Sequence, residues 1–388
     1  MENVSSSNGL EKYPKLRFPC FDQPYIVSPL SNYLFENTER NRDLLFDKED
    51  VLSVSGEFGV VNQIEFQGRS FAGESVAEYH VVNTNDVVYT KSPLKANPYG
   101  IIKTNKGVPG IVSTLYAVYH PKECTDPLYV EYYFGNDLRL NKFLKPLVNI
   151  GAKHDMKVNN EFVLTGEVCF PSVIEQQKIV QFLSCLDRRI EKQRCLVEHL
   201  KKYKRGLLDA IFNQKIHVTD GNEEWQECRI GDILKILHGR DYKDYQATNG
   251  EYPVLGTGGV IDHATKYLCD WPCVLIGRKG TIDKPQYMDT PFWTVDTLFY
   301  SKPEAFHNPK FQYYLFQTIN WKKYNEASGV PSQSSSTIEG ISVYVPNLKT
   351  QETIARLFSN VDELIEKQTS ILSQLQESKK GLLQQLFI

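Results

Sequence analysis

Two stretches of the chain place apolar residues at alternating intervals of four and three. The first runs from Ile179 to Ile211 and the second from Ile354 to Leu386. This repeat is a heptad seam, which indicates a supercoiled helix rather than a strand. A proline precedes each stretch, as suits a helix start. The pattern therefore predicts two long helices, at 171–213 and 346–388.

The two stretches are copies of one another. Setting Pro171 on Pro346 keeps one offset of 175 residues, without a gap, as far as Phe212 on Phe387. The tetrapeptide IEKQ occurs in both copies, and Asp187, Lys204 and other residues recur at the same offset. Chance does not hold register for that long, so the chain contains an internal duplication.

A helix of roughly 40 residues is about 60 Å long and needs a partner for its apolar stripe. The other copy is the simplest partner, and we expect an antiparallel coiled coil. Gln193 and Gln368 stand at matching places in the seams, where polar residues commonly fix register. The alternative is that both glutamines are merely tolerated at a solvated edge. The residues expected to pair are Ile179, Leu183, Leu186, Ile190, Gln193, Val197, Leu200, Ile354, Phe358, Val361, Ile365, Gln368, Leu372 and Leu375.

The regions before each helix have a different pattern, with short apolar runs broken by turn residues. Asp86–Thr90 and Cys273–Gly277 are expected to be buried strands, and Gly110–Tyr119 and Thr294–Tyr300 to be further strands. An aromatic, helix-like stretch follows in both regions. The predicted fold is α+β, with two globular α/β domains joined by the two helices in a pseudo-two-fold arrangement. Its expected domains are 1–170, 171–213, 214–345 and 346–388.

Composition narrows the class of protein. The chain has 388 residues, 41% of them hydrophobic and 23% charged, which is typical of a soluble globular protein with more than one domain. No apolar run is long enough to span a membrane, and residues 1–15 lack a signal core, so we expect a cytoplasmic protein. The eight cysteines have no zinc-site spacing and are expected to be free thiols.

Charge bears on the choice between partners. The net charge of −3 argues weakly against nucleic acid, because proteins that bind it are usually basic. However, residues 171–212 sum to +4, whereas 1–170 and 225–345 sum to −4 and −1. The basic residues are therefore concentrated in one segment.

Several ordered motifs in the second region are similar to one known family. They are RIGDI, GRDYK, YPVLGTGG, LIGRKGTI, VDTLFY and SGVPSQSSSTI, between residues 229 and 338. They resemble a target-recognition domain of the specificity (S) subunit of type I restriction-modification systems. The first region resembles another variant through NDVVYTKSPLKANPYG, GIVSTLYAVY and NIGAKHDM, and PSVIEQQKI resembles the family's entry into its spacer helix. The second copy departs modestly there, since Glu-Gln is replaced by Thr350-Gln351-Glu352.

The resemblance implies a non-catalytic subunit that reads double-stranded DNA. Each recognition domain would read one half of a split target, while the helices set the spacer and dock two methyltransferase subunits. Those partners would use S-adenosylmethionine to methylate adenine. Separate restriction subunits would supply nuclease and ATP-driven translocation, with Mg²⁺. This chain itself would carry no cofactor and no metal.

The candidate DNA-binding residues lie in turns and loops of both regions. Arg278 follows a strand directly, where a guanidinium could clamp a guanine edge or a phosphate; the alternative is a surface salt bridge. Lys91 is its positional counterpart in the first region. The other candidates, each of which could instead be an ordinary surface residue, are Lys103, Lys106, Lys153, His154, Arg240, Tyr242, Lys243, Lys279, Ser332, Gln333, Ser334 and Ser335.

An enzyme is not expected. NPYG at Asn97–Gly100 lacks the second proline of the amino-methyltransferase motif, and GTGG at Gly256–Gly259 lacks the residues of a phosphate loop. The sequence thus predicts a DNA-specificity and scaffold subunit. The competing hypothesis is a duplicated coiled-coil adaptor that holds two protein partners without touching DNA.

Overall fold

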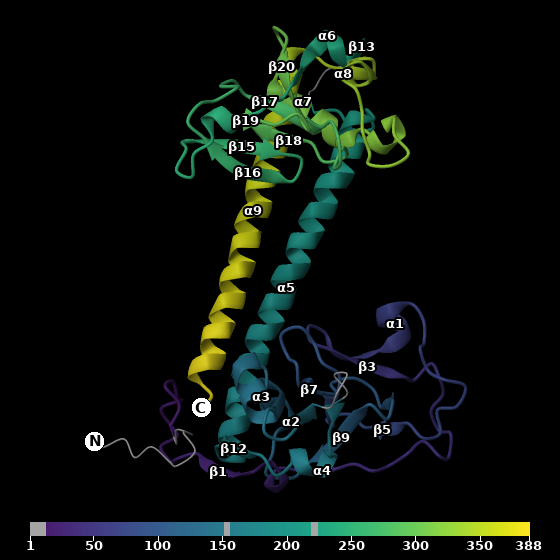
Figure 1. Cartoon of the computed structure of the whole chain (residues 1–388), viewed down its shortest axis with the longest axis vertical. Helices are drawn as coiled ribbons and strands as arrows, with labels where there is room; N and C mark the ends of the chain where they lie inside the picture. Colours follow the sequence, from purple (N-terminus) through teal and green to yellow (C-terminus); the bar gives the residue numbers. More distant parts are fainter. Residues whose placement is uncertain (1–12, 151–155, 219–223) are drawn as a thin grey trace. The chain divides into compact units, whose positions relative to one another are not determined.

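The computed structural model describes residues 13–150, 156–218 and 224–388. The chain divides into two compact units, Met1–Lys192 with Leu372–Ile388, and Gln193–Ile371. Each unit contains one block of strands and short helices, the first part of one long helix and the last part of the other (Figure 1). The predicted mixture of helices and sheets with two long packed helices is confirmed.

The block of the first unit is built on a four-stranded antiparallel sheet with strand order β2-β9-β6-β7. Smaller pairs, β3-β4, β5-β8 and β10-β11, flank it, and the pair β1-β12 lies just before the first long helix. The elements are β1 (Ile26–Pro29), η1 (Leu30–Asn32), β2 (Leu34–Glu36), β3 (Leu52–Ser55), β4 (Gly59–Asn62), α1 (Gln63–Gln67), β5 (His80–Val82), β6 (Val87–Thr90), β7 (Ile101–Thr104), β8 (Gly110–Val112), β9 (Tyr116–Pro121), α2 (Pro127–Tyr133), α3 (Asp137–Leu144), β10 (Asn149–Ile150), β11 (Met156–Lys157), α4 (Asn160–Val163) and β12 (Glu167–Phe170).

The block of the second unit is also built on a four-stranded antiparallel sheet. Its four-stranded sheet has the order β14-β20-β17-β18, beside a three-stranded sheet β16-β15-β19 and the pair β13-β21. The elements are β13 (Gln226–Arg229), α6 (Ile230–Ile233), β14 (Leu234–His238), η2 (Lys243–Tyr245), β15 (Tyr252–Gly256), β16 (Gly259–Ala264), β17 (Cys273–Gly277), β18 (Gln286–Met288), β19 (Trp293–Thr294), β20 (Leu298–Pro303), α7 (Pro309–Thr318), η3 (Trp321–Tyr324), α8 (Ser335–Glu339) and β21 (Ser342–Val345).

Two of the expected strands are each divided by a turn. The sequence predicts a strand over Gly110–Tyr119, but β8 ends at Val112 and the backbone N–H of Tyr116 donates to the Ser113 carbonyl at 3.1 Å. In the second block the N–H of Leu298 donates to the Val295 carbonyl at 2.9 Å in the same way. The apolar residues on both sides are buried, so their pattern conceals the turn between them.

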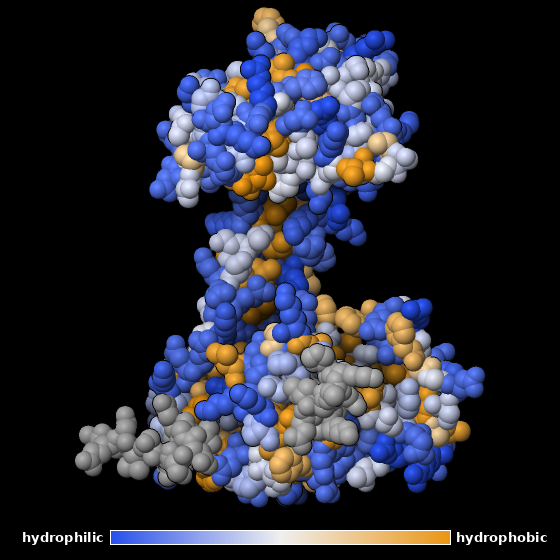
Figure 2. Space-filling view, in the orientation of Figure 1, coloured by the Kyte–Doolittle hydropathy of each residue, from blue (hydrophilic) through white to orange (hydrophobic). Residues whose placement is uncertain are grey.

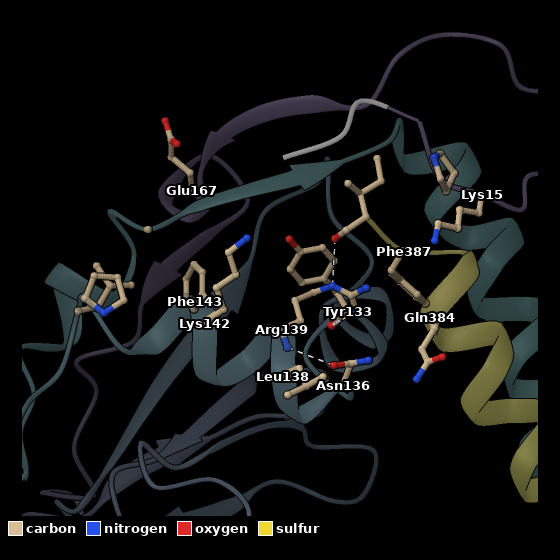
Figure 3. A pocket seen from close by; sticks show the side chains of 15 residues that line it. Lys15, Tyr133, Asn136, Leu138, Arg139, Lys142, Phe143, Glu167, Gln384 and Phe387 are labelled. Atoms are coloured by element: carbon tan, nitrogen blue, oxygen red, sulfur yellow. Dashed lines mark hydrogen bonds between the residues drawn. The ribbon is translucent and has the colours of Figure 1, made fainter. Parts of the chain in front are cut away.

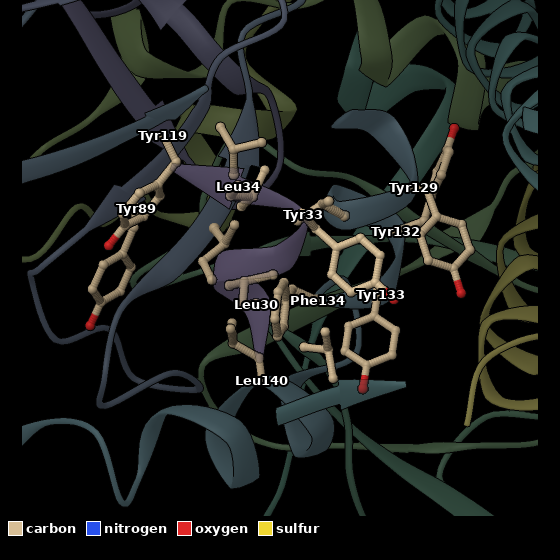
Figure 4. Packing of buried hydrophobic residues seen from close by; sticks show 14 of the residues in the cluster. Leu30, Tyr33, Leu34, Tyr89, Tyr119, Tyr129, Tyr132, Tyr133, Phe134 and Leu140 are labelled. Carbon is tan, nitrogen blue, oxygen red and sulfur yellow. The ribbon is translucent and has the colours of Figure 1, made fainter. Parts of the chain in front are cut away.

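The core of the first block is rich in aromatic residues. Figure 4 shows Tyr129 and Tyr133 of α2 in this core. Their ring centroids lie 5.0 and 4.9 Å from that of Phe170 in β12. Asp126 caps α2 by accepting hydrogen bonds from two backbone N–H groups, and Pro127 occupies the first turn of the helix. These local features fix the helix that carries the aromatic face into the core.

The long helices are α5 (Val173–Phe212) and α9 (Leu348–Gln385). In the first unit, side chains near the start of α5 share a hydrophobic cluster with residues at the end of α9. In the second unit, side chains near the end of α5 share a cluster with residues at the start of α9. The helices therefore run antiparallel. The residues concerned are Ile179, Leu183, Leu382 and Leu386 in the first cluster, and Leu208, Ile211, Ile354 and Phe358 in the second.

Burial differs along the seam. The buried positions are Ile179, Leu183, Ile190, Val197, Ile354 and Phe358, and the half-buried ones are Leu186, Gln193, Leu200, Val361, Ile365, Gln368, Leu372 and Leu375. The Gln193 side-chain amide donates to the Gln368 side-chain carbonyl at 2.8 Å and to its backbone carbonyl at 2.9 Å. These two hydrogen bonds from Gln193 to Gln368 favour the register interpretation over a solvated edge.

Candidate nucleic-acid interface

The sheet registers put Lys91 and Arg278 at equivalent places. Tyr89 pairs with Ala117 across β6 and β9, as Ile276 pairs with Phe299 across β17 and β20. Lys91 and Arg278 each lie two residues beyond that pair, immediately after the buried central strand. The sequence alignment of these two positions therefore corresponds to a real structural equivalence.

The backbones of Lys91 and Arg278 are held by equivalent hydrogen bonds. The N–H of Lys91 donates to the Leu115 carbonyl at 3.2 Å, and the N–H of Arg278 donates to the Thr297 carbonyl at 2.8 Å. The turns that divide the expected strands supply these two carbonyls. Gly277 precedes Arg278, and a Cβ there would lie 2.2 Å from the Thr281 carbonyl oxygen, so the close backbone approach requires glycine.

A polar loop that comes later in the sequence, at residues 331–333, packs against the backbone of residues 278–280. Lys279 forms an isolated bridge with Ser332, and the Gly280 N–H donates to the Pro331 carbonyl at 2.8 Å. The Arg278 guanidinium forms an ion pair with Asp296, with the arginine side chain 32% exposed. The structure thus brings Ser332 next to Arg278 and Lys279, from which it is distant in the sequence.

Gln333 and Ser334 occupy this loop in supporting positions. Gln333 is 3% exposed, and its side-chain amide donates to the Gly277 carbonyl at 2.8 Å. The Ser334 hydroxyl caps α8 by accepting from the Thr337 N–H at 3.2 Å, and Ser335 is the first residue of that helix. Burial argues against direct DNA contact by Gln333, contrary to the expectation from its polarity; it supports the strand end that presents Arg278.

The GRDYK loop is hydrogen-bonded to Thr294, the residue just before the turn 295–298. The Arg240 N–H donates to the Thr294 carbonyl at 2.8 Å, and its own carbonyl accepts from the Trp293 indole at 2.9 Å. A Cβ on Gly239 would lie 2.1 Å from the Val295 oxygen. Arg240 and Arg278 are consequently anchored on one short segment, 294–297.

The remaining two residues of that loop differ in exposure. Lys243 is exposed at the start of η2. Tyr242 is half-buried, and its hydroxyl donates to the Asp262 carboxylate at 3.1 Å, which ties the loop to β16. Lys243 can therefore reach a backbone phosphate more easily than Tyr242 can.

Lys91 has a different electrostatic environment from Arg278. Its ammonium donates to the Asn160 side chain at 3.3 Å, and the Asn160 amide donates to Glu36 at 2.7 Å. Burial lowers the pKa of Lys91, opposed by the Glu36 carboxylate. The cation of the first block is therefore held mainly by an amide.

Lys103 and Lys106 belong to a structural network. The Lys106 ammonium pairs with the Glu131 carboxylate at 2.9 Å, and the other oxygen of Glu131 accepts from the Thr104 N–H at 3.1 Å. Burial lowers the pKa of Lys103, with Glu131 opposing the shift. These contacts tie β7 to α2. Lys153 and His154 lie outside the described residues.

Sequence reasoning missed a polar cluster that occurs twice. The Tyr132 hydroxyl donates to Asp187 at 2.7 Å, and Lys379 pairs with the same carboxylate at 2.6 Å. In the second unit Tyr314 donates to Asp362 at 2.8 Å, and Lys204 pairs with that carboxylate at 2.7 Å. Each cluster joins a block to both helices. The repeated aspartates and lysines were visible in the sequence, but their tyrosine partners were not.

A cavity of about 620 Å³ in the first unit is lined by residues that include Tyr133, Arg139 and Phe387 (Figure 3). Arg139 donates to the Ile388 carbonyl at 3.0 Å and to the Tyr133 carbonyl at 2.9 Å, and its guanidinium lies 5.0 Å from the Tyr133 ring and 5.6 Å from the Phe387 ring. This arginine holds residues 387–388 on α3 and α2. The cavity belongs to that packing.

Residues 222–377 match the family model of the type I restriction modification DNA specificity domain. The resemblance to type I specificity subunits is confirmed. The match covers the second block and most of α9.

Two curated specificity subunits are similar in sequence. A putative type I specificity subunit of Mycoplasma pneumoniae is 24% identical over 217 residues, which is 53% of this chain and 58% of that protein. The match therefore spans less than two thirds of that protein's length. The specificity subunit of the type I restriction enzyme MjaVIII of Methanocaldococcus jannaschii is 23% identical over 346 residues, 78% of each chain.

Solved structures share the fold. A type I restriction-modification S subunit from M. genitalium has a TM-score of 0.62 at 15% identity, covering 97% of this chain and 99% of that one. A chain from a study of assembly and conformational transition of the type I R-M system has a TM-score of 0.56 at 14% identity, covering 92% and 96%.

None of the helices in the described residues is both long and apolar enough to cross a membrane. In the same residues, no group of three or more histidine, cysteine or acidic side chains is arranged to hold a metal ion.

Proposed function

We propose that this chain recognises a specific DNA sequence and acts as the scaffold of a type I restriction-modification complex. The observation that carries the proposal is the equivalence of Lys91 and Arg278, each presented after the central strand of its own block. Cations held on rigid strand ends can contact phosphates or guanine edges in a fixed geometry. A duplex is the ligand that matches two such positions in one chain.

Each block reads a different half of a bipartite target. The two blocks share a sheet plan but present different groups, a lysine beside an amide in one and an arginine beside polar loops in the other. Sequence is read through the identity and orientation of such side chains, while phosphate contacts only position the protein. The half-sites therefore differ in sequence.

The helices set the spacer and bind two methyltransferase subunits. Several seam residues are only half-buried, and two leucines next to seam residues in the sequence, Leu196 of α5 and Leu364 of α9, are each 42% exposed. Figure 2 shows hydrophobic surface along the helices beside hydrophilic residues. Exposed apolar side chains on a helix surface are suited to a protein partner.

The catalytic chemistry belongs to partner subunits. The methyltransferase subunits use S-adenosylmethionine to methylate adenine, and restriction subunits use ATP and Mg²⁺ to translocate and cleave double-stranded DNA. This chain directs those activities in the cytoplasm and performs none of them. It contributes the target and the spacing.

Methylome sequencing tests the proposal. A host that expresses this chain with its cognate methyltransferase is compared with a host that lacks only this chain. A new split motif with methyladenine in both halves is expected. If the complex assembles but no new motif arises, the protein-only adaptor becomes the better hypothesis. The net charge of −3 would agree with that outcome, because proteins that bind nucleic acid are usually basic.

A further inference from the structure

We infer that Asp296 is a specificity-determining residue that restrains Arg278 and weakens the binding of non-specific DNA. The inference rests on the proposed DNA-recognition function and deepens it for the second block.

The acid is in direct contact with the candidate DNA-binding cation. A guanidinium N–H of Arg278 donates to a carboxylate oxygen of Asp296. The Arg278 side chain is 32% exposed and the Asp296 side chain 64%. Asp296 belongs to the turn 295–298, whose Thr297 carbonyl already holds the Arg278 backbone. The turn therefore contacts both the backbone of Arg278, through Thr297, and its side chain, through Asp296.

The first block shows that the turn does not need an acid. Its equivalent turn is closed by the Tyr116 N–H on the Ser113 carbonyl, as the second is closed by Leu298 on Val295. Thr114 stands in the first turn where Asp296 stands in the second. The carboxylate is thus an addition to the second block, and its main contact is with Arg278.

A carboxylate in this position affects specific and non-specific DNA differently. Non-specific affinity comes almost entirely from phosphates, and an acid at the interface both repels them and occupies part of the guanidinium. A guanine edge offers two acceptors in a fixed geometry, and a guanidinium has further N–H groups for them while it keeps its carboxylate partner. Asp296 thereby lowers phosphate binding more than base recognition.

A double-mutant cycle on non-specific DNA tests the inference. The full chain and its Asp296→Asn, Arg278→Ala and double variants are titrated with a fluorescently labelled 30-base-pair duplex of random sequence over a series of salt concentrations. Asp296→Asn should tighten binding by about two- to fivefold, as expected for an exposed ion pair. Asp209→Asn is the matched control, because Asp209 of α5 forms an exposed ion pair with Lys215 at 2.9 Å. This variant should leave the affinity unchanged.

Each outcome decides a specific point. Tighter binding by Asp296→Asn that disappears in the Arg278→Ala background supports the restraint. An equal gain in both backgrounds overturns it, because the acid then acts only as a distant negative charge. Unchanged or weaker binding by Asp296→Asn also overturns it. If no variant and no wild-type chain binds the duplex at low salt, the proposed function itself is overturned.

Discussion

Neutralising Asp362 should destabilise the second unit measurably. Its carboxylate accepts from the Tyr314 hydroxyl at 2.8 Å and pairs with Lys204 at 2.7 Å, where the lysine side chain is 13% exposed and the aspartate 30%. Burial, reinforced by the hydrogen bond to Asp362, raises the pKa of Tyr314. Asp362→Asn would leave a largely buried ammonium without its counter-ion.

The expected cost follows from this partial burial. Breaking a fully buried pair costs roughly 3–5 kcal/mol, whereas an exposed pair is worth about 0–1 kcal/mol. With one partner largely buried and the other partly hydrated, we expect Asp362→Asn to lower the free energy of unfolding by about 2 kcal/mol. Replacing Lys204 by methionine in the same chain should recover much of the loss, because no uncompensated charge then remains.

Tryptophan fluorescence during urea unfolding isolates the relevant unit. All four tryptophans, at 225, 271, 293 and 321, lie in the second block. The matched control is Asp187→Asn, which breaks the equivalent cluster in the first unit and should leave the fluorescence midpoint nearly unchanged. If Asp362→Asn and the exposed-pair variant Asp209→Asn shift that midpoint equally, the argument from burial is refuted.

Four further outcomes are expected. Arg278→Ala should weaken or relax recognition of one half-site by about 1–3 kcal/mol, and unaltered methylation kinetics and specificity would remove Arg278 from the interface. Deleting one heptad within Leu186–Leu200 shortens α5 by about 10 Å and should alter the tolerated spacer, read from the methylome, with both half-sites intact. Gly239→Ala should lower the free energy of unfolding of the second unit by about 1–3 kcal/mol, because the new Cβ would clash with the Val295 oxygen. Gly258→Ala is the control, since a Cβ there has nothing within 4 Å, and equal fluorescence midpoints for the two variants would contradict the reasoning. His80 is 2% exposed, and burial, with Arg40 and Lys91, lowers its pKa to about 4. Between about pH 6.5 and 4 the unfolded chain binds the extra proton, so the free energy of unfolding should fall by about 2 kcal/mol as the pH falls; circular dichroism of urea unfolding should show less pH dependence for His80→Leu.

The helices and the duplication were predictable because heptad spacing records the face that a helix buries. The strand β17 was predictable for a similar reason, since all five of its residues are buried and apolar or glycine. The turn at Ser113–Leu115 was not, because the apolar residues on both sides belong to one core. A periodicity argument cannot separate a continuous strand from two strands joined by a tight turn.

The site was harder to predict than the fold. Arg278 could be found from its place after a strand, but its contact with Asp296 depends on the register of two strands that are distant in sequence. Gln333 looked like a surface residue because its neighbours are serines, yet its side chain is buried on Gly277. Lys103 and Lys106 looked free because Glu131, which binds Lys106, comes from another element.

The twin clusters also bear on how such a chain could arise and diversify. Each helix carries an aspartate and, seventeen residues later, a lysine: Asp187 and Lys204 in α5, Asp362 and Lys379 in α9. A helix of this kind is complementary to an antiparallel copy of itself, so an ancestral gene for one block and one helix could already encode every group of the pairing. After tandem fusion, the helices must continue to match each other, whereas the loops that carry Thr114 and Asp296 are free to diverge. The same chain can thus conserve its assembly while its blocks acquire new preferences independently.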